Sequence, residues 1–314
     1  MTVTHAAGAR VTRLVDNLSF SIDESETLAI VGESGSGKSV SSLAIMGLLS
    51  ADLSVTSGRI LFEGKDLLTL SSEEMRHRRG RDMSMVFQEP MTSLNPVRTI
   101  GSQITEGIRE NLGLSRAAAR ERAIALLTEV GVADAERRMR QYPHHFSGGM
   151  RQRVMIAIAL SANPKLIIAD EPTTALDVTI QAQVLDLMAR LCREHKVALI
   201  LITHNLGLVA RYADRVNVMY GGRLVESGSA IALYQSPRHP YTRGLLQSVP
   251  RLNQSKQIKL QPVNGTPADP FVKIDGCRFH PRCTYAKELC RSQSPEFNDD
   301  LACYYPVETE ARID

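Results

Sequence analysis

The sequence lacks tryptophan, is poor in aromatic residues and contains no apolar run long enough to cross a bilayer. Phe, Trp and Tyr together make up 5% of the 314 residues. A membrane-spanning helix needs about 20 consecutive apolar residues, whereas the longest apolar segments here are short, such as Val197 to Ile202. We therefore expect any role at a membrane to require partner chains.

An excess of charge of either sign is also missing. Lys and Arg number 37 against 34 Asp and Glu, a formal net charge of +3, so bulk electrostatics does not favour a nucleic-acid partner. The first ten residues, Met1 to Arg10, lack the charged start and apolar stretch of a secretory signal. The sequence thus predicts an intracellular protein with reduced cysteines, and 43% hydrophobic residues suffice for a folded core.

A glycine-rich stretch stands between a short apolar run, Leu28 to Val31, and a helix-like segment, Val40 to Leu49. It has the pattern G-x-x-x-x-G-K-[ST], in which backbone N–H groups and a helix N-terminus surround phosphate oxygens. The residues expected to bind phosphate are Gly32, Ser34, Gly35, Ser36, Gly37, Lys38 and Ser39. In this pattern the lysine reaches the β- and γ-phosphates and the last hydroxyl ligates Mg²⁺. The alternative, a fortuitous Gly/Ser-rich turn, does not explain the strand before it and the helix after it.

Polar residues follow three further strand-like segments. Gln88 follows Met83 to Phe87, Asp170 and Glu171 end a buried run, and His204 follows Ala198 to Thr203. Ligands collect at the carboxyl ends of parallel strands. Asp170 is predicted to hold Mg²⁺ through water, and Glu171 to polarise the attacking water. The alternatives are that the two acids cap the next helix and that the histidine is structural.

A second glycine-rich turn opens another helix. Ser147, Gly148 and Gly149 precede the helical segment Met150 to Ala162. A helix N-terminus with free N–H groups is a second anion site.

The remaining pattern alternates between strands and helices. Leu18 to Ile22 alternates apolar and polar residues, as a strand of an antiparallel sheet does. Residues 89–163 read as helices; among them Ser115 is the expected N-cap of a helix Arg116 to Val130, which Gly131 ends. The sequence predicts an α/β protein with a helical subdomain inserted between strands.

Taken together, these residues resemble the ATP-binding subunit of an ABC transporter over nearly the whole chain. The diagnostic order is the phosphate loop, Ser147 to Gly149, the strand ending in Asp170 and Glu171, then Asp177 and His204. The resemblance implies a RecA-like P-loop NTPase core with an antiparallel β subdomain, an inserted helical subdomain and a C-terminal extension. It also implies that the protein binds ATP and Mg²⁺ and hydrolyses ATP.

The resemblance assigns roles to individual residues. Two such domains pair head to tail, so that the Ser147–Gly149 turn of one closes the phosphate loop of the other. Glu171 is the general base, Gln88 senses Mg²⁺ and the attacking water, Asp177 communicates across the dimer, and His204 contacts the γ-phosphate. Family members stack adenine on an aromatic residue of the first strand; here that position falls at His5, and the first strand is expected to be abbreviated or absent.

The C-terminal part resembles the extension of the oligopeptide, dipeptide and nickel importer group. The similar segments are 237–246 and 276–283, with Glu33 and residues 89–96 also typical of that group. The predicted domains are an ABC ATPase domain at 1–235 and an extension at 236–314. The implied partners are a second ATPase subunit, identical or paralogous, two transmembrane permeases and an extracytoplasmic solute-binding protein. The expected place is the cytoplasmic face of the inner membrane, as a peripheral subunit.

Four of the five cysteines fall in this extension. Cys277, Cys283, Cys290 and Cys303 have the spacing C-x5-C-x6-C-x12-C, the ligand count of a [4Fe–4S] cluster or a structural zinc ion. Zinc sites usually contain closer pairs, and the resemblance favours the cluster. The alternatives are a zinc site, unliganded or oxidised thiols, and a redox or iron sensor that gates transport.

The predicted function is ATP hydrolysis that drives import of peptides. Nickel, opines and other small solutes of the same group are alternatives. A soluble ABC ATPase without a transport role is disfavoured, because such proteins usually carry two nucleotide domains or a long coiled-coil insertion.

Overall fold

The computed structural model describes residues 1–8, 10–88, 93–174, 176–248 and 263–307. The chain forms two compact units, each assembled from separate segments. Unit 1 comprises residues 1–21, 28–68 and 203–314, and unit 2 comprises residues 22–27 and 69–202. None of the described helices combines the length and the apolar character that a membrane crossing requires.

Unit 1 contains an antiparallel sheet in the order β2-β1-β4, from β1 (Thr2–Ala7), β2 (Arg10–Val15) and β4 (Leu53–Ser57). Strand β1 lies between its two neighbours, with His5 opposite Thr12 on one side and Leu53 on the other. The expectation of an abbreviated first strand is therefore wrong: six residues suffice because both edges of β1 are hydrogen-bonded. The amino group of Met1 also donates to the Leu18 carbonyl at 2.6 Å.

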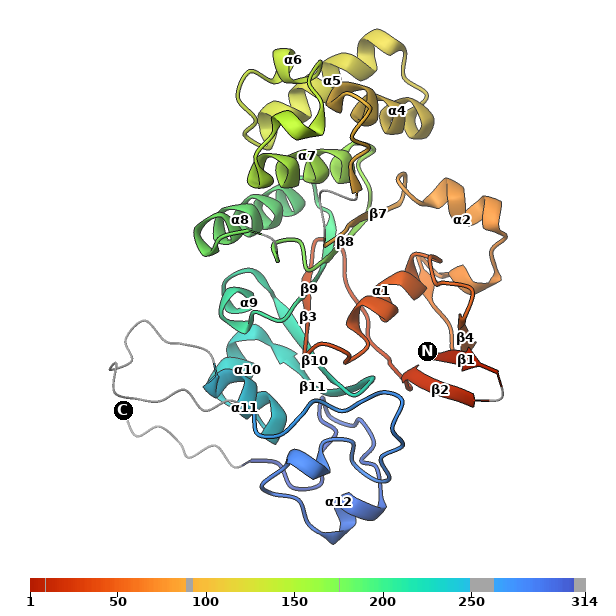
Figure 1. Ribbon diagram of the computed structural model, residues 1–314, viewed down its shortest axis with the longest axis vertical. Coiled ribbons are helices and arrows are strands. Elements are labelled where there is room, and N and C mark those ends of the chain that lie inside the picture. Colours follow the sequence, from red (N-terminus) through yellow and green to blue (C-terminus); the bar gives the residue numbers. More distant parts are fainter. Residues whose placement is uncertain (9, 89–92, 175, 249–262, 308–314) are drawn as a thin grey trace. The chain divides into compact units, whose positions relative to one another are not determined.

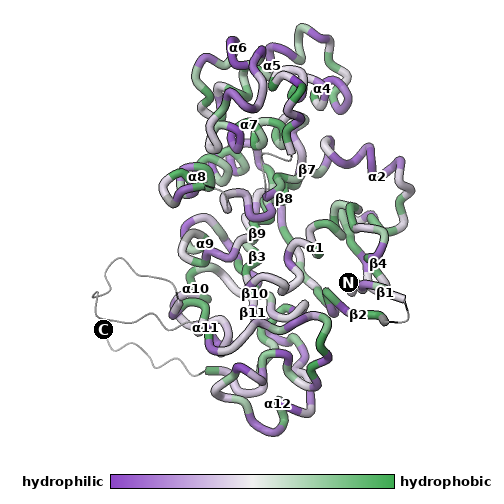
Figure 2. Tube along the Cα trace, viewed as in Figure 1, coloured by the Kyte–Doolittle hydropathy of each residue, from purple (hydrophilic) through white to green (hydrophobic). Residues whose placement is uncertain are grey.

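A second group of strands in unit 1 supports the glycine-rich loop. Strand β10 (Arg215–Tyr220) pairs parallel with β3 (Thr27–Val31) and antiparallel with β11 (Arg223–Ser229). Strand β3 is buried throughout, as the apolar run predicts, and it appears green in the hydropathy colouring (Figure 2). The predicted strand Leu18 to Ile22 is wrong, since these residues are irregular.

The remaining elements of unit 1 are short. They are α1 (Lys38–Ile45), β5 (Leu61–Phe62), β6 (Lys65–Asp66), α9 (Leu206–Tyr212), α10 (Ala230–Gln235), α11 (Pro240–Gln247), η3 (His280–Arg282) and α12 (Glu288–Ser292). The turn η1 (Leu67–Thr69) lies where the chain leaves unit 1.

The C-terminal extension shares the core of unit 1. Tyr241 of α11 and Phe279 are buried in one apolar cluster with Val31 of β3 and Val218 of β10. The side chain of Asp16, 7% exposed, pairs with Arg223 and Arg278 at 2.6 and 3.0 Å. A buried carboxylate needs such partners, because removing one leaves an uncompensated charge.

Unit 2 contains a parallel sheet segment, β7-β8-β9, formed by Met83–Val86, Leu166–Asp170 and Ala198–Thr203. Its helices are α2 (Ser72–Arg78), α4 (Ile100–Leu112), α5 (Arg116–Glu129), α6 (Ala135–Arg138), η2 (Pro143–His145), α7 (Gly148–Leu160) and α8 (Val178–Glu194). Within this unit α4, α5 and α6 gather beside α7 (Figure 1).

Helix α5 begins where the sequence predicts and ends one residue earlier than predicted, at Glu129. The Ser115 hydroxyl accepts a hydrogen bond from the Ala118 N–H, and Gly131 follows the helix at φ +75°. Its apolar face is buried at Leu127 and Val130, so capping and periodicity determine this element locally.

Candidate functional site

In unit 1 the glycine-rich stretch forms a turn between β3 and α1. A Cβ atom at Gly32 would lie 2.2 Å from the Met219 carbonyl oxygen, and one at Gly37 would lie 2.9 Å from the Leu14 carbonyl oxygen. The φ angles of +155° and +95° are also those that glycine tolerates. The backbone of β10 and the end of β2 thus leave no room for a side chain at Gly32 or Gly37, so both positions require glycine.

The loop leads directly into the N-terminus of α1. Gly37 is the N-cap residue and offers no side chain to the first N–H groups of the helix. Such groups, with the helix dipole, attract an anion. The Ser36 hydroxyl is buried and has no hydrogen-bond partner among the described residues, whereas Ser34, Gly35 and Ser39 are exposed. The loop can therefore hold phosphate oxygens.

The ammonium group of Lys38 lies across the start of this loop. It donates to the Gly32 carbonyl at 2.8 Å and to the Glu33 carbonyl at 3.0 Å. The lysine side chain is buried, so it is already desolvated and directed at the loop. His204, by contrast, lies on an exposed turn after β9.

In unit 2 the ends of β7 and β8 bring Gln88 and Glu171 together. The Gln88 amide Nε2 donates to Glu171 Oε2 at 3.3 Å, and the Thr174 hydroxyl donates to the same oxygen at 3.0 Å. Asp170, the last residue of β8, is buried. The parallel pairing of these strands, Val86 opposite Ala169, places the predicted residues at one edge, as the sequence analysis expects.

Glu171 adopts a backbone conformation that is unusual for its residue type. Its φ angle is +46°, and its N–H donates to the Ile202 carbonyl at 2.9 Å. A non-glycine residue in this region costs on the order of 1–3 kcal/mol and is often found at functional sites. The sequence gives no signal for this strain.

The Ser147–Gly149 turn opens α7 in unit 2. The Ser147 hydroxyl accepts from the Met150 N–H at 3.4 Å, and a Cβ at Gly149 would lie 3.0 Å from Ile180 of α8. Asp177 caps α8 through the Ile180 N–H at 3.0 Å. The starts of α7 and α8 are therefore in contact. Asp177 has a structural role that the sequence analysis missed.

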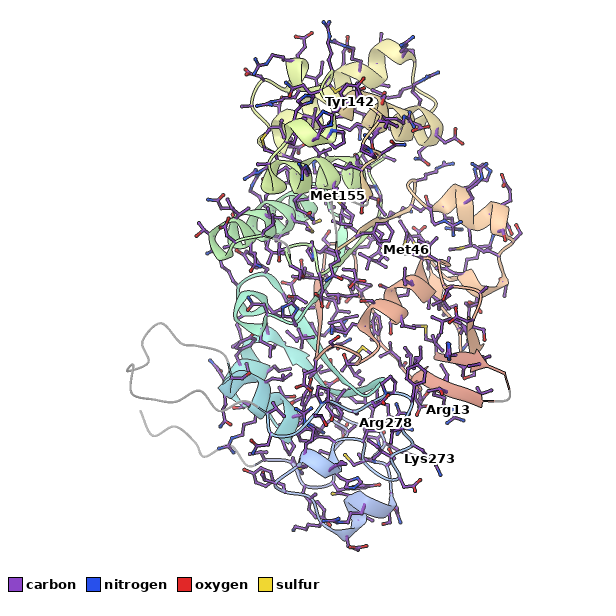
Figure 3. All side chains as sticks on the ribbon, viewed as in Figure 1. Arg13, Met46, Tyr142, Met155, Lys273 and Arg278 are labelled. Carbon is purple, nitrogen blue, oxygen red and sulfur yellow. The ribbon has the colours of Figure 1, made fainter. Side chains whose placement is uncertain are left out.

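His5 has two neighbours that sequence reasoning also missed. Its Nε2 lies 3.1 Å from Asp52 Oδ2, and its ring meets Phe271 edge-on with centroids 5.6 Å apart. Phe271 lines a pocket beside β2 together with Arg13 and Arg278. Figure 3 labels the two arginines. The histidine is thus oriented by a carboxylate and an aromatic ring.

The four cysteines of the extension are free thiols that line one pocket. Its other walls include Phe279, Tyr285 and Tyr304. Burial raises the pKa of Cys277 and Cys283, and raises the pKa of Cys303 to about 11, so the thiol form is favoured. Among the described residues, no three His, Cys, Asp or Glu side chains are arranged to hold a metal ion. The structure thus shows four thiols on one pocket and, among the described residues, no preformed metal site.

One predicted segment lies partly outside the described residues, and one predicted residue forms a salt bridge that the sequence does not predict. Residues 89–92 of the segment that follows Gln88 are outside the described part of the chain. Glu33, singled out as typical of one importer group, forms a salt bridge with Arg282 of the extension. No sequence pattern links two residues 249 positions apart.

Two family models match the chain. One, described as ABC transporter, matches residues 15–174, and the other, described as oligopeptide/dipeptide transporter, C-terminal region, matches residues 225–290.

Curated relatives are similar over most of their length. The dipeptide transport ATP-binding protein DppD of Escherichia coli is 47% identical over 305 residues, which cover 96% of this chain and 93% of the relative. The oligopeptide transport ATP-binding protein OppD of Bacillus subtilis is 52% identical over 282 residues, covering 90% and 79%.

Solved structures confirm the predicted fold. The ATP-binding cassette MJ0796, a dimer in a post-hydrolysis state bound to ADP and Pi, is 27% identical with a TM-score of 0.65. The likeness covers 73% of this chain and 96% of that one. The α/β P-loop NTPase core with an antiparallel subdomain is thus the fold of the chain.

Proposed function

Because the chain belongs to the ABC transporter family, matched over residues 15–174, we propose that it is the ATPase subunit of an importer for dipeptides or oligopeptides. The observation that carries the peptide assignment is the match of residues 225–290 to the C-terminal region of oligopeptide/dipeptide transporters. Relatives named for peptide transport support it. Nickel, opines and other small solutes are the alternatives within the same group.

We propose a division of labour among the site residues. The N–H groups of the Gly32–Ser39 loop and the Lys38 ammonium hold the triphosphate, and the Ser39 hydroxyl and Asp170 hold Mg²⁺, which neutralises phosphate charge when bound. The Glu171 carboxylate takes the proton of the attacking water, while Gln88, within hydrogen-bond distance of Glu171, orients that water. His204 contacts the γ-phosphate.

A second ATPase chain completes the site in this proposal. The exposed Ser147–Gly148 turn of one chain closes over the phosphate loop of the other, and Asp177 lies at the same interface. His5 contacts the adenine ring. Two permeases and a solute-binding protein complete the importer, with this subunit at the cytoplasmic face of the membrane.

We propose the domain limits that the sequence resemblance implies. An ABC ATPase domain spans residues 1–235, with its helical subdomain at 89–163, and the peptide-importer extension spans residues 236–314. The family matches at 15–174 and 225–290 support an ATPase domain followed by a separate C-terminal region, and the second match begins shortly before the proposed limit at 235.

We further propose that the extension binds a [4Fe–4S] cluster. Four free thiols on one pocket are the donor set of a cluster with four cysteine ligands, and ligation would stabilise a segment with few helices and strands. Anaerobically purified protein should then contain iron and sulfide and absorb visible light. Stoichiometric zinc without iron would favour a zinc site instead, and a metal-free, fully folded extension would refute both.

Uptake in cells tests the transport function. A strain that lacks this gene should lose uptake of a labelled dipeptide and regain it with the wild-type gene, but not with Glu171→Gln. Loss of nickel uptake with normal dipeptide uptake would overturn the peptide assignment. Normal uptake of every solute, with ATPase activity intact, would instead favour a protein without a transport role.

A further inference from the structure

The backbone of Glu33, the second residue of the phosphate loop, is held on two sides. Its N–H donates to the Tyr241 hydroxyl at 2.8 Å, and its carbonyl accepts from the Lys38 ammonium at 3.0 Å. Tyr241 is completely buried in α11 of the extension. The position of this peptide therefore depends on a residue 208 positions further along the chain.

The Glu33 side chain is held by the same extension. Arg282 donates to both carboxylate oxygens, with Nη1 2.5 Å from Oε2 and Nη2 3.0 Å from Oε1. This is the bidentate geometry in which an arginine fixes direction as well as charge. The carboxylate can neither rotate nor approach the loop interior without breaking two charged hydrogen bonds.

Arg282 is itself fixed before it meets Glu33. Its Nε donates to the Asn264 carbonyl at 2.7 Å and its Nη2 to the Val263 carbonyl at 3.1 Å. The guanidinium carbon lies 5.7 and 5.9 Å from the ring centroids of Tyr220 and Phe279. Only 5% of the arginine side chain is exposed, compared with 24% for Glu33. The extension thus presents a preoriented cation to the loop.

An unpaired carboxylate at Glu33 would repel the phosphate groups that the loop is expected to bind. Glu33 lies one residue after Gly32 and five before Lys38, within the stretch expected to hold a polyanion. Like charges in a partly buried setting repel strongly, because the local dielectric is low. Neutralising Glu33 removes that repulsion, and holding its side chain outward keeps the loop open.

We propose that Arg282 and Tyr241 are positioning residues of the nucleotide site, through which the C-terminal extension orients and neutralises Glu33 and so sets the affinity for ATP. The inference rests on the proposed ATP-binding function of the loop. Arg282 acts through Glu33 and does not touch the nucleotide.

Titration calorimetry with a non-hydrolysable ATP analogue and Mg²⁺ tests the proposal on the full chain. Arg282→Ala should raise Kd about tenfold. Arg282→Lys keeps the charge but lacks the planar guanidinium, so its Kd should lie between those of the wild type and Arg282→Ala. The loss in Arg282→Ala should shrink as salt is raised, because screening weakens repulsion.

The decisive comparison removes the carboxylate as well. Glu33→Gln should bind at least as tightly as wild type, and the double variant Arg282→Ala with Glu33→Gln should return to within about twofold of it. A merely structural salt bridge predicts the opposite, since breaking it from either side would weaken binding. Arg291→Ala, which removes an exposed cation of α12, is the matched control and should not change Kd.

Two further outcomes separate this inference from the proposed function. Unchanged affinity in Arg282→Ala, together with weakened binding in Lys38→Ala, overturns the positioning role alone. Unchanged affinity in both overturns the ATP site itself. If Arg282→Ala does not fold, Arg282→Lys with and without Glu33→Gln carries the same comparison, and failure of Glu33→Gln to restore affinity refutes the proposal.

Discussion

At the scale of single residues, Glu171 combines a strained backbone with two hydrogen bonds to one carboxylate oxygen. The bonds from Gln88 and Thr174 fix the direction of the carboxylate. A group held in this way is suited to accept a proton from a water molecule placed beside it.

Glu171→Gln should leave ATP affinity unchanged and lower the rate of hydrolysis by about 10²–10⁴-fold, the usual contribution of general base catalysis. The amide has the same shape but cannot take a proton at neutral pH. Phosphate release from the purified chain measures the rate, and calorimetry measures affinity. Turnover within threefold of wild type would contradict the proposed role of Glu171 as the base.

Lys38→Ala should act on binding itself. The lysine is buried and its ammonium already reaches the loop carbonyls, so its removal deletes a charge-assisted contact of about 1.5–3 kcal/mol. That corresponds to a rise in Kd for ATP of about 10- to 100-fold. Lys65→Ala, an exposed lysine of β6, serves as control, and equal affinity in the two variants would speak against the phosphate-loop assignment.

At the scale of elements, the start of α11 is held by a buried histidine and a buried carboxylate. The His239 Nδ1 accepts from the Tyr241 N–H at 3.1 Å, and the buried Glu226 carboxylate accepts from the N–H groups of Arg238 and His239. Burial lowers the pKa of His239 to about 3. The histidine is therefore neutral in the folded protein.

This shift predicts that the fold weakens in mild acid. The unfolded chain binds a proton at His239 below about pH 6.5, whereas the folded chain resists it down to about pH 3. The free energy of unfolding should fall as pH drops through this window, with a slope from this group of up to about 1.4 kcal/mol per unit. Denaturant melts at pH 7.5, 6.0 and 5.0 measure it.

His239→Asn keeps a hydrogen-bond acceptor near Nδ1 and removes the titrating group. Its stability should depend less on pH between 6.5 and 5 than that of the wild type. His77→Asn, a change at an exposed histidine of α2, should leave the wild-type slope. Identical slopes in all three proteins would show that His239 does not control the acid response.

Elements whose limits depend on neighbouring residues could be predicted from the sequence, and those that depend on distant ones could not. Helix α5 follows from a serine cap, an apolar face and a terminal glycine within one stretch of chain. Strand β1 was missed because its pairing with β2 and β4, not its length, stabilises it. Leu18 to Ile22 has a strand pattern but is irregular.

The candidate site also has parts that could be predicted from the sequence and parts that could not. The phosphate loop and the ends of β7 and β8 follow from local patterns, because the strand, turn and polar residue are contiguous in sequence. The salt bridge of Arg282 with Glu33 and the contact of Phe271 with His5 join residues far apart in the sequence. Neither contact could be deduced without the fold.

At the scale of the whole molecule, the chain contains one phosphate loop and one Ser147–Gly149 turn. If two identical chains complete each other's sites, Glu171→Gln with ATP should form a stable dimer in light scattering. Ser147→Arg, placed in the same background, should bind ATP and stay monomeric, because its bulk obstructs the turn. A Glu171→Gln chain that stays monomeric with ATP bound would contradict pairing of identical chains.

The link between Glu33 and Arg282 also bears on how the protein is made. At about 5–20 residues per second, a ribosome needs roughly 12–50 s to add the 249 residues that separate them. During that time the nascent loop carries an unopposed negative charge and lacks its fixed shape. Full affinity for nucleotide would arise only once residue 282 has been added, so shorter nascent chains would bind ATP more weakly than finished subunits.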